Sequence, residues 1–175
     1  ATDLTRGDAN GGFTLGIPLT SRRDDVLAAI GDITLDLSGG VNDLSDFGTL
    51  YNWSAGLNWS PFENLNLQLS HIYTERAPSL SQLGAPQLVT SGATIFDIAT
   101  GQTAVVDIIT GGNPDLVAEK QRDWKIGLNY DLPFFRRSNV IVEYYDESST
   151  DVSSGFPALT PTIEAAFPGR VVRDA

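Results

Sequence analysis

The sequence predicts an all-β protein, an antiparallel meander of about six long strands that forms a portion of a transmembrane β-barrel. Apolar and polar residues alternate over segments of roughly 8 to 11 residues, the length that a tilted strand needs to cross a bilayer. Tryptophan and tyrosine lie near the ends of the apolar stripes, as they do at membrane interfaces. The connections are short at one end of the predicted sheet and long at the other.

Each predicted strand is a segment in which every second residue is apolar. The first contains Pro18, an irregularity because proline cannot donate a ladder hydrogen bond. The second is the clearest, since Ile33 and Leu35 alternate with acidic and hydroxyl residues. The last is the least regular, because Ile141 and Tyr145 lie on its polar face. The predicted strands cover residues 13–19, 32–42, 51–60, 64–73, 124–132 and 140–145.

The face opposite each apolar stripe carries Asn, Ser, Gln, Gly and Asp, with few Lys or Glu. This composition fits a wet barrel interior better than an open protein surface. The aromatic residues at the stripe ends include Trp53, Trp59 and Trp124. His71 lies in line with the leucines of its strand, and we interpret it as an interfacial histidine beside Tyr73.

The connections between the predicted strands fall into two classes. Residues 60–64 form a tight turn, and residues 133–139 form a second short one. Residues 76–120 instead join two strands by about 45 residues, which a compact domain rarely uses. A second long, irregular stretch follows at residues 146–170. Short turns on one side and long loops on the other are typical of outer-membrane barrels.

The connections also contain local structure of their own. Within the first long connection, residues 95–98 and 105–108 flank Gly101 and predict a hairpin. Thr160 and Pro161 have the residue types preferred at the N-cap and first position of a helix. The sequence therefore predicts two short helices, at residues 24–30 and 161–166.

The composition argues against several classes of function. A net charge of −11 disfavours a nucleic-acid partner, whose phosphates would be repelled. The chain has no cysteine for thiolate sites and a single histidine, His71, so a zinc cluster is excluded. Loop carboxylates such as Asp24 and Asp25 lack EF-hand spacing, and no G-x-S-x-G motif occurs. We therefore expect no catalytic residue, no metal and no cofactor, and conclude that the chain is not an enzyme.

Several motifs occur in a distinctive order. RAPS at residues 76–79 ends one strand, and NPDL at residues 113–116 is followed by Glu119. Trp124 then begins a strand of the Trp-x-x-Gly-Leu type. The segments DFGTLYNWSAGLNWSPFENLNLQLS and FPGRVVRDA add to the pattern. In this order and spacing, the motifs resemble the barrel of a TonB-dependent outer-membrane receptor over nearly the whole chain.

The resemblance implies a domain organisation. Residues 1–175 would be a partial receptor β-barrel, with residues 76–120 as one long extracellular loop and 146–170 as a second. A complete barrel of this kind has about 22 strands around a plugged lumen. We therefore expect the chain to be roughly a quarter of a receptor, without the plug domain. Loop 76–120 is the candidate ligand-binding region, because such loops usually carry function.

The resemblance also implies a function. The receptor would lie in the outer membrane of a Gram-negative bacterium and import a scarce solute by active transport with TonB-coupled energy. The solute would be a siderophore, a vitamin or an oligosaccharide. The implied partners are outer-membrane lipid, the small solute ligand and TonB, which would act through the missing plug region.

Two other hypotheses remain open at this point. A processed barrel fragment could self-associate through exposed strand edges into a structural oligomer or filament. The apolar, β-branched segment 104–109 has the character that favours such assembly. The other hypothesis is a soluble β-sandwich binding module, in which the unequal loop lengths would need another cause.

Overall fold

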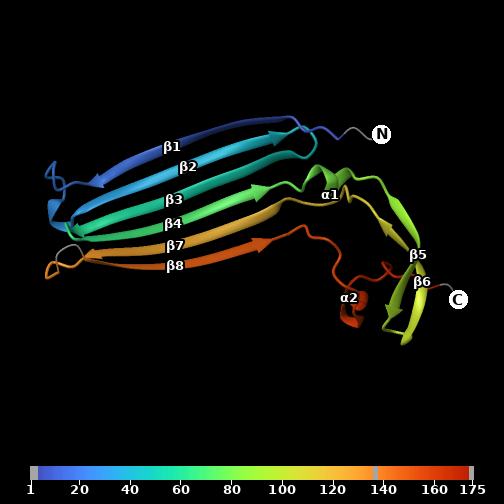
Figure 1. Cartoon of the computed structure of the whole chain (residues 1–175). Coiled ribbons are helices and arrows are strands. Elements are labelled where there is room, and N and C mark those ends of the chain that lie inside the picture. Colours follow the sequence, from blue (N-terminus) through green and yellow to red (C-terminus); the bar gives the residue numbers. More distant parts are fainter. Residues whose placement is uncertain (1–3, 136–137, 174–175) are drawn as a thin grey trace. The chain divides into compact units, whose positions relative to one another are not determined.

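The computed structural model describes residues 4–135 and 138–173, which fold as two units (Figure 1). The sheet unit comprises residues 5–78 and 117–152. The loop unit comprises residues 79–116 and 153–173, together with Leu4. Parts of the predicted turn 133–139 and of the motif at 167–175 lie outside the described residues.

The sheet unit is one antiparallel sheet of six strands in the order β1-β2-β3-β4-β7-β8 (Figure 1). All six predicted strands are confirmed, and the observed strands contain 12 to 15 residues each. They are long because the alternating pattern continues to the points where the chain turns. Their bounds are β1 Asp8–Thr20, β2 Asp32–Leu44, β3 Gly48–Phe62, β4 Leu65–Arg76, β7 Glu119–Asp131 and β8 Asn139–Thr150.

The register aligns the apolar stripes of neighbouring strands on one face. Leu37 lies opposite Ala55 across β2 and β3, and His71 lies opposite Trp124 across β4 and β7. Directly paired residues project to the same side of an antiparallel sheet, so the alternation of each strand extends across the whole sheet. The result is one apolar face and one polar face.

The two irregularities in the ladder occur at prolines. The β1–β2 register shifts between Pro18 and Thr20, and β1 is an edge strand. The β3–β4 register shifts between Trp59 and Phe62, a segment that contains Pro61. Proline is tolerated in sheets at edges and bulges because it has no N–H to donate. The irregularity predicted at Pro18 is therefore confirmed.

Aromatic rings gather on the apolar face in its half nearer the long connections. The His71 imidazole stacks on Trp124 with 4.1 Å between ring centroids, and it meets the edge of Trp53 at 4.9 Å. Trp53 also stacks on Tyr73 at 6.2 Å. These rings form an aromatic row across β3, β4 and β7. The interfacial position of His71 stays a prediction.

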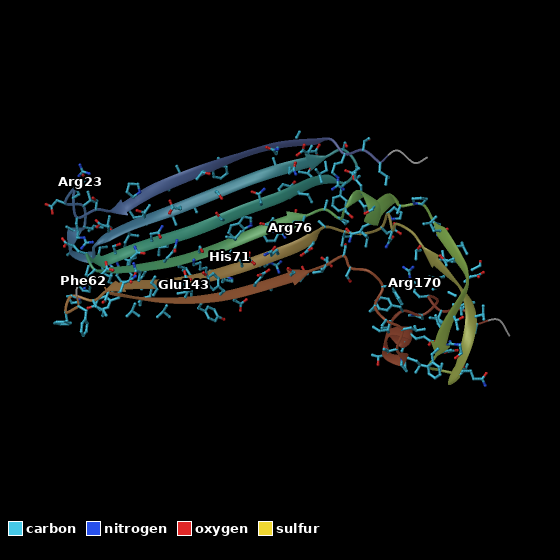
Figure 2. All side chains as sticks on the ribbon, in the orientation of Figure 1. Arg23, Phe62, His71, Arg76, Glu143 and Arg170 are labelled. Atoms are coloured by element: carbon cyan, nitrogen blue, oxygen red, sulfur yellow. The ribbon has the colours of Figure 1, made fainter. Side chains whose placement is uncertain are left out.

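The two long connections leave from the same end of the sheet, after β4 and after β8. The tight turn between β3 and β4 lies at the opposite end, where Figure 2 labels Phe62. Two connections depart from the predicted segregation: the short turn 45–47 lies at the long-loop end, and the longer connection 21–31 lies at the short-turn end. Within the connection 21–31, the helix predicted at residues 24–30 is wrong: only a 3-10 turn, η1 (Ala28–Ile30), forms. Asp25 and Leu27 have positive φ angles, which interrupt a right-handed helix.

The loop unit contains a hairpin and two short helices. Strands β5 (Leu88–Asp97) and β6 (Gln102–Thr110) form the hairpin that was predicted around Gly101. Helix α2 (Pro161–Ala166) begins where predicted, and the Thr160 hydroxyl accepts a hydrogen bond from the Ile163 amide at 3.2 Å. Helix α1 (Leu80–Gly84) was not predicted.

Few apolar side chains are enclosed. Of the described Leu, Ile, Val, Phe, Tyr and Trp side chains, only Leu44 and Leu50 are buried. A soluble sandwich of this size would bury the apolar face of its sheet against a second layer. No helix among the described residues is long and apolar enough to cross a membrane.

Candidate functional site

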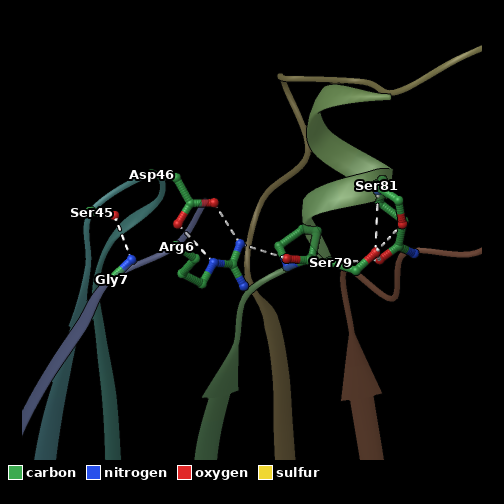
Figure 3. Close-up of polar contacts among 8 residues, drawn as sticks. Arg6, Gly7, Ser45, Asp46, Ser79 and Ser81 are labelled. Atoms are coloured by element: carbon green, nitrogen blue, oxygen red, sulfur yellow. Dashed lines mark hydrogen bonds and ion pairs between the residues drawn. The ribbon is translucent and has the colours of Figure 1, made fainter. Parts of the chain in front are cut away.

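The predicted ligand-binding region begins at the rim of the sheet, directly after Arg76. The Arg6 guanidinium lies at this rim and donates two hydrogen bonds to the Asp46 carboxylate, both of 2.7 Å (Figure 3). Its Nη2 also donates to the Pro78 carbonyl at 2.9 Å. These bonds lower the pKa of Asp46 from its ordinary value, so its charge persists into acid. Arg6 thus holds the turn between β2 and β3 against the exit from β4.

Helix α1 opens the loop unit with a capping box (Figure 3). The Ser79 hydroxyl accepts from the Gln82 amide at 3.2 Å, and the Gln82 side chain accepts from the Ser79 amide at 2.8 Å. The Gln82 side-chain amide also donates to the Ser153 carbonyl at 3.2 Å. The first long connection is therefore bonded to the second at this helix. The S-x-x-Q signature is visible in the sequence and could have predicted the helix.

The return toward β7 is a turn, as its residue types indicate. The Asn113 side chain accepts a hydrogen bond from the Asp115 amide at 3.1 Å. The Asn113 amide donates to the Gln82 carbonyl at 2.7 Å. Asn113 therefore serves as a turn residue that docks on helix α1.

Asp97 sits at the end of β5 and organises the hairpin turn. Its carboxylate accepts from the Ala99 amide at 3.0 Å, and its carbonyl accepts from the Gly101 amide at 2.8 Å. Gly101 has φ of 70°, a conformation that glycine adopts without strain. Asp97 is only 8% exposed, so its charge needs a partner.

Arg173 supplies that partner from the second long connection. Its guanidinium donates to both oxygens of Asp97, at 2.9 Å and 2.8 Å. It also forms an ion pair with Glu164 of α2. Hydrogen bonds from Arg173 hold the pKa of Asp97 well below its ordinary value, and both carboxylates raise the pKa of Arg173. We call this three-residue group the Arg173 clamp.

A cavity of about 690 Å³ lies between the hairpin and the segment 155–172. Two charged residues, Asp107 and Arg170, line it, and neither forms an ion pair with another described residue. Figure 2 labels Arg170 beside the hairpin. The apolar part of the lining includes Ile95, Val106, Ile108, Phe156, Leu159 and Val172. Ligand sites commonly combine such an apolar lining with a few polar groups.

The polar face of the sheet carries its own network. The Lys125 ammonium pairs with the Glu143 carboxylate at 2.9 Å. The Gln121 amide donates to Asp123 at 3.0 Å and 3.1 Å and to Glu147 at 3.1 Å. Within the described part of the chain, no group of His, Cys, Asp or Glu residues could hold a metal ion. The side chains of this network can offer hydrogen bonds and charge to a ligand.

The sheet has the strand lengths, the apolar face with its aromatic row, and the polar face of a transmembrane barrel wall. The sequence matches the family described as TonB dependent receptor-like, beta-barrel, over residues 12–167. The chain belongs to this family, whose members are receptors and transporters of the outer membrane. In such a barrel the apolar face meets lipid and the polar face lines the interior.

A solved structure supports the same fold. The chain is similar in fold to the crystal structure of the siderophore receptor PirA from Pseudomonas aeruginosa, with a TM-score of 0.53 and 18% identity. The similarity covers 81% of this chain and 24% of that one, so the chain spans about a quarter of that receptor. No curated protein matches the chain.

The structure brings together residues that the sequence did not connect. Asp97 and Arg173 are 76 positions apart, and no spacing or motif links them. The length of the connection 76–120 predicts it as the candidate region. The cavity, however, is also lined by residues of the second long connection. The S-x-x-Q pattern at Ser79 and Gln82 is a local signal from which helix α1 could have been predicted.

Proposed function

We propose that this chain forms part of the wall and outer loops of an outer-membrane receptor that imports a scarce solute. TonB would supply the energy through a plug region beyond the described strands. The observation that carries the proposal is the loop unit, in which both long connections contribute to the lining of a cavity. A receptor that must capture a dilute solute needs such a preformed site on its outer side.

The polar and apolar faces support the same proposal. The six-stranded sheet has unpaired edges at β1 and β8, so further strands are needed to complete a closed barrel. Outer-membrane lipid would contact the apolar face, and the solute would pass along the polar face. The loop region 76–120 would bind the solute together with residues 153–173. A siderophore, a vitamin or an oligosaccharide fits this description.

The proposal is tested by uptake in cells that carry the receptor containing this chain. Radiolabelled ferric siderophores, cobalamin and oligosaccharides are offered singly, with and without functional TonB. We expect one of them to accumulate only when TonB is present. Replacing Phe156 and Arg170 by alanine should lower its accumulation by about tenfold, which corresponds to roughly 1.4 kcal/mol of binding.

The matched control is Arg23→Ala, because Arg23 is an exposed arginine in the connection between β1 and β2. This variant should import at the unmodified rate. Recovery of the receptor outside the outer-membrane fraction, or accumulation that does not depend on TonB, would contradict the proposal.

A further inference from the structure

The polar face of the sheet contains a hollow that is lined by residues of β1, β2 and β3. Gly12 of β1 lies opposite Gly40 of β2, and Gly40 lies opposite Asn52 of β3. These three residues form one row across the sheet, on the face that carries the polar residues. This row and its neighbours line a shallow, open hollow of about 540 Å³.

Neither glycine of this row is required by the backbone conformation, because neither has a positive φ angle. A Cβ atom on Gly12 would come within 2.9 Å of the Gly39 carbonyl oxygen, which belongs to the backbone. A Cβ atom on Gly40 would meet the Asn52 side-chain oxygen at 2.8 Å. The opposite face differs, since the Phe13 ring covers Gly39 there. On the polar face, the sites of the two missing side chains are thus bordered by the sheet backbone at Gly12 and by the Asn52 side chain at Gly40.

The rows on either side frame the hollow with amides and hydroxyls. Asn10 pairs with Asn42 on the side nearer the long connections, and Thr14 pairs with Ser38 on the other. None of the residues that line the hollow is charged. A charged ligand would therefore find no opposite charge to offset the loss of its hydration.

One amide at the hollow lacks a protein partner. The side-chain oxygen of Asn42 is buried and accepts no hydrogen bond. Asn10 and Asn52 are exposed on this face. A buried acceptor without a partner costs stability, so its retention calls for an explanation such as a bound ligand.

We propose that this hollow is a binding subsite for an uncharged, polyhydroxylated solute, that is, for a sugar ring of an oligosaccharide. Hydroxyl groups both donate and accept hydrogen bonds, and asparagine side chains offer both functions. The inference rests on the proposed function, because it requires the polar face to line a solute path. It narrows the solute to a neutral sugar.

The test uses the whole receptor that contains this chain, labelled and purified in detergent. It is applied to an array of neutral oligosaccharides, acidic oligosaccharides and immobilised ferric siderophores. We expect retention by at least one neutral oligosaccharide. Gly40→Leu fills the hollow and should weaken that retention by at least about tenfold.

The matched control is Gly56→Leu. Gly56 lies on the same polar face of β3 but does not line the hollow, and a Cβ atom there has no contact closer than 3.7 Å. This variant should bind the sugar as the unmodified receptor does. Retention of the sugar by Gly40→Leu at full strength would overturn the inference.

A second variant separates a binding role from a structural one. Asn42→Ala removes the unpaired oxygen without filling the hollow, so thermal stability should stay equal or rise while sugar binding falls several-fold. A fall in stability with unchanged binding would mean that another part of the protein occupies the hollow, and would overturn the inference.

The proposed function can survive the failure of this inference. If no neutral sugar is retained, yet TonB-dependent uptake of another solute is observed, only the sugar subsite is wrong. If uptake shows no dependence on TonB for any solute, the proposed function itself fails.

Discussion

Arg173 illustrates how a single side chain can organise a loop. Its guanidinium satisfies the buried Asp97 carboxylate through two hydrogen bonds and reaches Glu164 at the same time. The planar fork of arginine suits this geometry, and a lysine would supply only a point charge. The clamp therefore depends on the residue type and on the ionisation of two carboxylates.

This dependence predicts how the loop unit responds to acid. The ordinary pKa of Asp97 is 3.8, and Arg173 lowers it in the folded protein. A lowered pKa gives stability that is fully present above the ordinary value and is lost as the pH falls through the folded value. We expect protection of the β5–β6 hairpin against hydrogen exchange, corrected for intrinsic rates, to stay constant from neutral pH to about pH 4 and to decline below it.

In Arg173→Met the buried carboxylate loses its cation, so the hairpin should exchange faster at neutral pH. Protonation of Asp97 then removes an unpaired buried charge, so acid should reduce the protection of the hairpin less in this variant than in the unmodified protein. Arg170→Met is the control, because Arg170 forms no ion pair with another described residue. Equal protection of the hairpin in Arg173→Met and in the unmodified protein would show that the clamp contributes nothing.

Among the secondary-structure elements, those in which apolar and polar residues alternate strictly could be predicted from the sequence. Every strand of the sheet was predicted because one face of a barrel wall is apolar and the other polar over its full length. The hairpin was predicted because Gly101 separates two β-branched segments. The helix predicted at residues 24–30 does not form, because Asp25 and Leu27 adopt left-handed φ angles. The residue types at these two positions do not predict such angles. The cavity and the clamp could not be predicted, because they depend on contacts between distant segments.

The hairpin turn offers a prediction at this scale. Gly101 has φ of 70° and open space around it, so Gly101→Ala adds strain without a clash. The expected cost to the hairpin is about 1 kcal/mol. Gly155→Ala is the control, because Gly155 lies in open space without a positive φ angle. Faster hydrogen exchange in β5 and β6 for Gly101→Ala alone would confirm the prediction, and equal rates in both variants would refute it.

Among the described residues, the six-stranded sheet encloses few apolar side chains. Its apolar face exposes large side chains, among them Phe13, Tyr51, Trp53 and Ile126. Its edge strands β1 and β8 each lack a partner on one side. In a barrel, lipid covers the face and neighbouring strands satisfy the edges, so both features are expected of a wall segment.

The isolated chain should therefore not remain a monomer in detergent-free buffer. Unpaired edges and an exposed apolar face favour association between copies. Light scattering should report particles far larger than the 18.8 kDa chain, and a mild detergent should reduce their size. A stable species of 18.8 kDa that unfolds cooperatively without detergent would contradict the barrel-wall assignment.

The Arg173 clamp has a consequence for receptor engineering. A change of specificity could be attempted by grafting one long connection of a receptor onto another barrel. Here the hairpin carries the buried Asp97 carboxylate, and its cationic partner Arg173 belongs to the other connection. A graft of residues 88–110 alone would therefore leave this carboxylate without its partner. The two connections should be exchanged together, so that the ion pair between them is kept.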